Sequence, residues 1–194
     1  HINIMQPFDN IVKAVSTPSL SSMFFIMFIY NIGTGFFIAF WGVVLATKFG
    51  FTQSGVGGFF SYYGIMMFIT QGIIVRKLSG KIADYKILRY SIILVGIFIV
   101  IGYFVPTNHI TWLFYILPLL AVCSALTRAF STALLLSLSP AEIYGGVLGI
   151  NSSTLALSQA IPAILAGYLA SHHVMLPIVT GGVFIIFSGC LFRY

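Results

Sequence analysis

Acidic residues are almost absent from this sequence, which has three among its 194 positions: Asp9, Asp84 and Glu142. Lysine and arginine are also scarce, at nine residues, so charged side chains make up 6% of the chain. Soluble globular domains carry about 25% charged residues. Because 59% of the residues are hydrophobic and the mean hydropathy is +1.07, the composition excludes an ordinary soluble domain.

Cysteine and histidine are also rare. Cys123 and Cys190 both fall inside apolar runs, which excludes a disulfide-stabilised secreted domain and is typical of small buried hydrophobic residues. The adjacent pair His172 and His173 points in two directions, which is unsuitable for a shared metal ion. The first 18 residues are too polar, with two prolines, for a cleavable signal peptide. We therefore expect no metal site and no cofactor.

Long apolar runs dominate the sequence instead. A helix that spans a membrane needs about 20 apolar residues, whereas a spanning strand alternates apolar and polar positions. The runs here, such as residues 91–101, do not alternate. The sequence thus predicts an all-α membrane protein with six transmembrane helices: Leu20–Ala46, Gly55–Val75, Ile87–Val105, Ile110–Leu138, Val147–Ala170 and Val174–Leu191.

More than half of the basic residues lie in one connection, between the second and third runs: Arg76, Lys77, Lys81, Lys86 and Arg89. Cytoplasmic loops of membrane proteins carry such an excess of lysine and arginine. With this loop inside, seven basic residues and both termini are cytoplasmic, and one basic residue is outside. The pattern indicates topology and no nucleic-acid partner, and we expect a multi-pass protein of a bacterial plasma (inner) membrane.

Two regions are predicted. Residues 1–18 have apolar positions at helical spacing and indicate a cytoplasmic linker or interfacial helix. Residues 19–194 form a six-helix transmembrane bundle, since the short connections force antiparallel neighbours. Helix starts are marked by Thr17–Pro18 and by Ser139–Glu142, where a cap residue precedes proline and Glu142 reaches back to the cap. Three helices followed by three of opposite orientation predict a three-plus-three inverted repeat.

Polar side chains are unevenly distributed over the six runs. The third and sixth runs carry almost none, and we expect them to face lipid on most sides. The other four hold amides, hydroxyls and one charge, which are costly in hydrocarbon without a partner or water. This division favours an aqueous path along one side of the bundle, although hydrogen bonding between helices explains any single residue. We select as a candidate substrate cavity Tyr30, Asn31, Thr34, Arg128, Asn151, Thr154 and Ser158.

Arg128 is the residue of this set with the clearest consequence. At ~1.5 Å per residue it lies about 16 Å from the cytoplasmic end of its helix, near mid-membrane. A guanidinium at that depth costs from ~3 to more than 10 kcal/mol. The acidic residues all belong to the cytoplasmic edge, so two interpretations stay open. Arg128 either meets a substrate or another chain segment in a cavity, or it braces helices through backbone carbonyls.

Asn151, Thr154 and Ser158 share one face of the fifth helix, at spacings of three and four residues. Glycines recur in the second and fifth runs, where we expect them to let helices approach closely. These glycines are Gly55, Gly57, Gly58, Gly64, Gly145, Gly146 and Gly149.

Three motifs, in order and at matching spacing, resemble the carboxy-terminal half of a major facilitator superfamily transporter of the drug:proton antiporter branch. Residues 71–88 are similar to the loop after the second helix of that half, residues 126–134 around Arg128 to the family's tenth helix, and residues 139–167 to its eleventh. The resemblance implies one half of a twelve-helix secondary active transporter that exports small molecules by alternating access, with proton-coupled antiport.

The same resemblance implies the partners. These are a missing amino-terminal six-helix half, which carries the proton-binding acids, a small-molecule substrate, protons and membrane lipid. It also implies a cytoplasmic gating loop formed by Arg76, Lys77, Lys81, Asp84 and Lys86.

Two other classes are compatible with six helices. A complete six-helix channel, or a transporter subunit that works as a dimer, stays an alternative. An intramembrane protease is disfavoured, because all four histidines lie outside the spans and no glycine-x-serine-x-glycine motif occurs. We therefore expect no enzyme activity and no catalytic residues.

Overall fold

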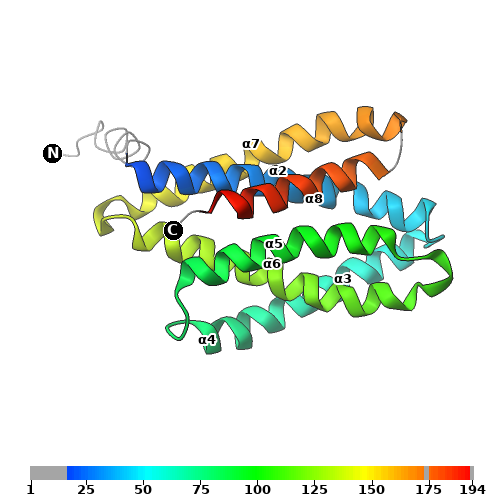
Figure 1. Ribbon diagram of the computed structural model, residues 1–194, viewed down its shortest axis with the longest axis horizontal. Helices are drawn as coiled ribbons and strands as arrows, with labels where there is room; N and C mark the ends of the chain where they lie inside the picture. The colour runs from blue at the N-terminus through cyan, green and yellow to red at the C-terminus, as the bar shows by residue number, and fades with distance from the viewer. Residues whose placement is uncertain (1–16, 173–174, 193–194) are drawn as a thin grey trace.

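The computed structural model describes residues 17–172 and 175–192, which form helices joined by short connections (Figure 1). Five helical segments are long and apolar enough to cross a membrane. They are α2 (Pro18–Thr47), α3 (Gln53–Ile69) continued by a π-helical turn (Thr70–Ile74) and α4 (Val75–Leu78), α5 (Asp84–Phe104), α6 (Thr111–Ser137), and α7 (Tyr144–His172).

The last helix, α8 (Met175–Leu191), is apolar but has 17 residues, so a sixth crossing stays a prediction. Two 3-10 turns, Thr107–His109 and Ala141–Ile143, lie in the connections before α6 and α7. The predicted linker or interfacial helix falls within residues 1–18, almost wholly outside the described residues.

The two predicted helix starts have different outcomes. α2 begins at Pro18 with the extended Thr17 at the cap position, as predicted. Proline suits this position because the first N–H groups of a helix have no partner within it. The capping interaction predicted at Ser139–Glu142 is wrong. The Ser139 hydroxyl donates to the Leu135 carbonyl at 2.6 Å, because the last carbonyls of α6 need partners as well.

The helices alternate in direction, so the described chain begins and ends at the same end of the bundle as the connection between α4 and α5 (Figure 1). α8 packs between α2 and α5, α6 packs on α5, α7 on α2, and α3 on α6. Across the bundle the order is therefore α7, α2, α8, α5, α6, α3. The first and last long helices of the chain thus lie side by side.

Glycines set how closely α8 approaches its neighbours. A Cβ added at Gly181 would lie 2.8 Å from the Gly33 carbonyl oxygen, and one added at Gly96 would lie 3.0 Å from the Gly182 carbonyl oxygen. We call these contacts of α8 with α2 and α5 the glycine seam. The expectation that the two apolar runs face lipid on most sides is wrong, because α8 packs between α2 and α5, and α5 packs between α8 and α6.

The glycines singled out in α3 and α7 behave differently. A Cβ added at Gly57, Gly58, Gly64, Gly145 or Gly149 would meet no atom within 4 Å. The hydrophobic stretches of α3 and α7 are 11% and 12% buried, against 67% for α2. The prediction of close approach is therefore wrong at these positions among the described helices. We call α3 and α7 the flank helices.

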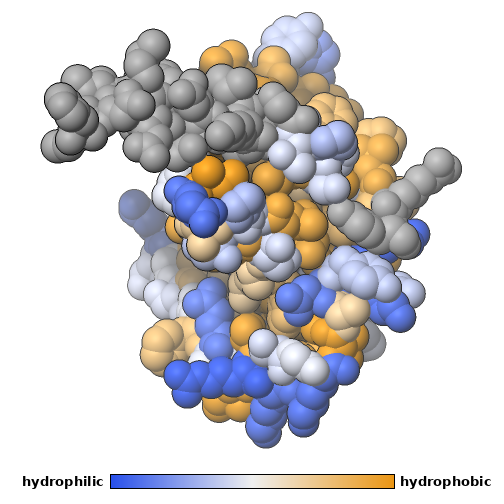
Figure 2. Space-filling view, turned by 90° about the vertical axis from the view of Figure 1, so that its left-hand side faces the viewer, coloured by the Kyte–Doolittle hydropathy of each residue, from blue (hydrophilic) through white to orange (hydrophobic). Residues whose placement is uncertain are grey.

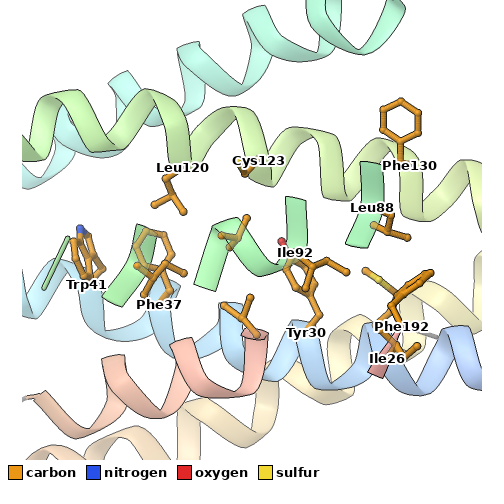
Figure 3. Packing of buried hydrophobic residues seen from close by; sticks show 14 of the residues in the cluster. Ile26, Tyr30, Phe37, Trp41, Leu88, Ile92, Leu120, Cys123, Phe130 and Phe192 are labelled. Carbon is orange, nitrogen blue, oxygen red and sulfur yellow. The ribbon is translucent and has the colours of Figure 1, made fainter. Parts of the chain in front are cut away.

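The core fills the space between α2, α5 and α6 (Figure 3). Phe37 and Trp41 of α2 stack with ring centroids 5.2 Å apart, and they face Leu120 of α6. Cys123, further along α6, is buried and Cys190 is exposed, and both are free thiols. This core holds α2 and α6 at fixed positions, and the polar residues of both helices lie on its edge.

Candidate functional site

A cavity of about 190 Å³ opens along one side of the bundle, between the flank helices. α2, α3, α5, α6 and α7 all contribute to its wall. Its apolar lining includes Phe37, Val95 and Leu120. Its polar and charged lining consists of Tyr30, Asn31, Thr34, Tyr63, Ser124, Arg128, Ser131, Thr132, Asn151 and Gln159.

Five of the seven predicted cavity residues meet at this wall: Tyr30, Asn31, Thr34, Arg128 and Asn151. They come from α2 and from the consecutive helices α6 and α7. The residues on α2 are well held, since Tyr30 and Asn31 are buried and the Thr34 hydroxyl donates to the Asn31 carbonyl at 3.1 Å. The structure therefore brings together a polar surface that combines hydroxyl, amide and guanidinium groups.

Thr154 and Ser158 do not line this cavity. α7 presents Asn151, Leu155 and Gln159 instead, which are spaced four residues apart. Ser158 is fully buried, and its hydroxyl donates to the Leu155 carbonyl at 2.8 Å. Asn151, Thr154 and Ser158 do share the inward side of α7, since they are less exposed than Ser152, Ser153 and Ala156 between them. α7 packs on α2, however, and of the three residues only Asn151 reaches the cavity, so the cavity role predicted for Thr154 and Ser158 has no contact in its favour.

Arg128 lies on α6, and its side chain is exposed to the cavity. Among the described residues that line the cavity, it is the one with a charge, and none of them carries a carboxylate. Ser131 and Thr132 donate to its backbone carbonyl at 3.0 and 3.2 Å. Within the described part of the chain, no backbone carbonyl accepts a hydrogen bond from its guanidinium, so the bracing interpretation has no contact in its favour.

Several lining residues were missed by the sequence-based selection. Ser124, Ser131 and Thr132 surround Arg128 at spacings of three and four residues on α6, which places them on its face. That spacing around a single intramembrane charge was a usable signal. Tyr63 and Gln159 belong to the predicted polar helices, but only the packing decides which of their polar residues reach the cavity.

The predicted gating-loop residues lie at one end of the bundle, away from the cavity wall. Arg76 and Lys77 are on α4, Lys81 follows it, and Asp84 and Lys86 are in the first turn of α5. The four basic side chains are exposed and Asp84 is half-buried. An acid in a first turn interacts favourably with the helix dipole. The described residues contain no group of His, Cys, Asp or Glu that could hold a metal ion.

The chain is distantly similar to transport proteins. It is 22% identical over 160 residues to solute carrier family 67 member A1 of Homo sapiens and 21% identical over 160 residues to solute carrier family 22 member 18 of Mus musculus. Both alignments cover 82% of this chain but 37% and 39% of the relatives, so the chain spans about two fifths of their length. No protein-family model matches the chain.

The apolar helices support an integral membrane protein, and both relatives that the chain resembles are named as solute carriers. These similarities are consistent with a protein that is not an enzyme.

Proposed function

We propose that this chain is the carboxy-terminal half of a secondary active transporter of the major facilitator type, which exports small molecules by alternating access in exchange for protons. The observation that carries the proposal is the exposed Arg128 in a polar cavity between otherwise apolar helices. An ionisable residue inside a membrane bundle usually faces a substrate path. Tyr30, Asn31, Thr34 and Asn151 supply further contacts to the substrate.

The neighbour pattern supports a three-plus-three inverted repeat. If the first three long helices are exchanged with the last three, α2 corresponds to α6, α3 to α7, and α5 to α8. The contact of α2 with α7 then corresponds to that of α6 with α3, and the contact of α2 with α8 to that of α6 with α5. Such repeats place the substrate site at their interface, which is where this cavity lies.

Two open faces support a partner bundle. On α7, small exposed residues recur every three or four positions at Gly149, Ser153, Ala156 and Ala160. On α3, Gly57, Ser61 and Gly64 form a similar exposed face. Small residues at this spacing let transmembrane helices pack closely. We propose that the missing amino-terminal half covers both faces and closes the cavity, in agreement with the greater length of the relatives.

The proposal includes an orientation. Both termini and the basic loop are cytoplasmic, in a plasma membrane of the bacterial inner-membrane type, on the charge distribution. Arg76, Lys77, Lys81, Asp84 and Lys86 then form a gating loop at the cytoplasmic end, where they contact the other half.

Substitution of Arg128 tests the function. Arg128→Lys keeps the charge but loses the planar guanidinium fork, and we expect transport per folded molecule to fall at least tenfold while the amount of folded protein stays normal. The measurement is proton-gradient-driven accumulation of a panel of fluorescent dyes by the whole protein in proteoliposomes. Val183→Ala, on the exposed side of α8, is the control and should leave the transport rate unchanged. A full rate per folded molecule for Arg128→Ala would exclude a role for Arg128 in the cavity.

A further inference from the structure

A second groove lies on the outside of the bundle, at the end that carries the basic loop. It has a volume of about 340 Å³, and its walls come from the end of α4, from α5 and from α6. Lys86 stands among its lining residues, together with Tyr90, Leu94, Cys123 and Leu126. This groove shares no lining residue with the cavity that contains Arg128.

The interior of the groove offers apolar surface. The buried hydroxyl group, on Ser91, is already used, since it donates to the Leu88 carbonyl at 3.0 Å and accepts from the Thr127 hydroxyl at 3.1 Å. The remaining lining is aliphatic, apart from the buried thiol of Cys123 and the exposed side chains of Lys86 and Tyr90. A polar solute would therefore lose its hydration without gaining partners. A hydrocarbon chain fits this surface.

The charge at the groove is positive. Lys86 is exposed at the start of α5, and Arg89 lies exposed one turn further along the same helix. Lys77 is exposed on α4 and Lys81 on the connection that follows it, and Figure 2 shows hydrophilic side chains gathered over α4 and the start of α5. A cation at the solvent-exposed end of an apolar groove complements a lipid whose anionic headgroup is joined to an acyl chain.

The opposite end of the bundle provides an internal contrast. A groove there of about 470 Å³ is lined by Ile101, Phe104 and Trp112 and contains no lysine or arginine. Lys48 follows α2 at this end of the bundle. Its ammonium donates to the Tyr103 carbonyl and lies 4.3 Å from the centre of the Tyr103 ring. Apolar grooves therefore occur at both ends, but an exposed cation accompanies only the groove at Lys86.

We propose that the groove at Lys86 binds one anionic phospholipid, with an acyl chain against Leu94 and Leu126 and the phosphate at the Lys86 ammonium. The bound lipid would hold α5, α6 and the basic loop together at this end. The inference does not depend on transport activity, because it rests on the groove and its charge.

The test compares matched variants of the whole protein, purified in detergent, by native mass spectrometry with phosphatidylglycerol and phosphatidylcholine. We expect one retained phosphatidylglycerol per protein and no comparable retention of phosphatidylcholine. Lys86→Gln should weaken this binding about fivefold, since a basic residue near a lipid surface contributes about 1 kcal/mol. Lys81→Gln, which removes an equal charge outside the groove, should weaken it less than twofold.

A third variant separates the groove from the surface charge. Leu94→Trp fills the groove and leaves every charge in place, so it should abolish the retained lipid while the unfolding temperature stays within a few degrees of the wild type. Equal weakening by Lys86→Gln and Lys81→Gln, or unchanged binding in a folded Leu94→Trp protein, would overturn the proposal in favour of diffuse attraction. Equal retention of the two lipids would overturn it as well.

Discussion

Glycines in the seam and glycines in the flank helices have opposite surroundings. At Gly33 and Gly181 the backbones of α2 and α8 approach so closely that a methyl group would lie within 3 Å of a carbonyl oxygen. At Gly64 of α3 and Gly149 of α7 a methyl group would meet nothing within 4 Å. Glycine therefore lies at a close helix–helix contact in the seam and on an exposed face in the flank helices.

The difference separates the part of the bundle that holds itself together from the part that needs a partner. The seam joins α2, α5 and α8 by backbone approach, which leaves little freedom to move. Only a small part of each flank helix is buried against the other helices of the bundle, and the polar cavity lies between the two flank helices. Binding groups are therefore carried by a fixed scaffold and by two helices with unpaired faces.

Substitution in the seam should have the largest effect on stability. In Gly181→Ala the new methyl group would lie 2.8 Å from the Gly33 carbonyl oxygen and 2.9 Å from Phe36 Cβ, so helices must separate. We expect a loss of about 1–3 kcal/mol in the free energy of unfolding, the range for overpacked cores. Thermal unfolding in detergent, followed by the amount of monodisperse protein, measures it.

Gly64→Ala is the matched control for that experiment. The same methyl group enters open space, and alanine favours a helix over glycine by up to ~1 kcal/mol, so stability should stay level or rise. If both variants lose equal stability, the distinction between seam and flank is wrong.

Bulk added to a flank face should leave the bundle folded and impair the whole transporter. Ala156 is exposed on the small-residue face of α7, and Ala156→Leu fills the space proposed for the partner half. We expect less than ~0.5 kcal/mol change in stability, as for a surface substitution, and a several-fold loss of transport per folded molecule. Val183→Leu, on the exposed side of α8, is the control and should be silent in both measurements. Normal transport by Ala156→Leu would argue that this face contacts lipid.

Structural features that depend on local composition could be predicted well from the sequence. Helices form where the apolar runs lie, and α2 starts at Pro18, because hydropathy and proline act through the chain itself. Arg128 was found because a charge in an apolar run is conspicuous. Five predicted cavity residues meet because polar side chains of apolar helices gather where water can reach them.

What failed depends on contacts between distant segments. The rotation of α7 about its own axis decides whether Ser158 or Gln159 faces the cavity, and packing on α2 sets this rotation. The seam was missed because Gly181 and Gly64 both lie in apolar runs, and only the arrangement of the helices distinguishes them. The Ser139 hydroxyl could have capped the helix that follows it, but it donates to the Leu135 carbonyl at the end of α6 instead.

A smaller effect on stability than in the seam is expected at Asp84, where α5 begins. Asp84 is half-buried in the first turn of α5, directly after the connection from α4. Asp84→Asn keeps the shape and removes the charge, so it should reduce the free energy of unfolding by about 0.3–1 kcal/mol, the value of an acid at a helix start. If the proposed gating loop controls opening, the same variant should nevertheless change the balance between inward-open and outward-open states.

A reporter cysteine at Thr132 separates these two roles of Asp84. Thr132 lines the cavity on α6, and Cys123 and Cys190 are replaced by alanine so that the reporter is the one thiol among the described residues. We expect Asp84→Asn to change the rate at which this cysteine is labelled from the side of the basic loop several-fold. The reason is that the proposed gating loop would lose the carboxylate with which it closes the cavity. Glu142→Gln removes another carboxylate, just before α7, and should leave the rate unchanged. An unchanged labelling rate in Asp84→Asn would mean that Asp84 only stabilises the start of α5 and that opening of the cavity does not depend on this loop.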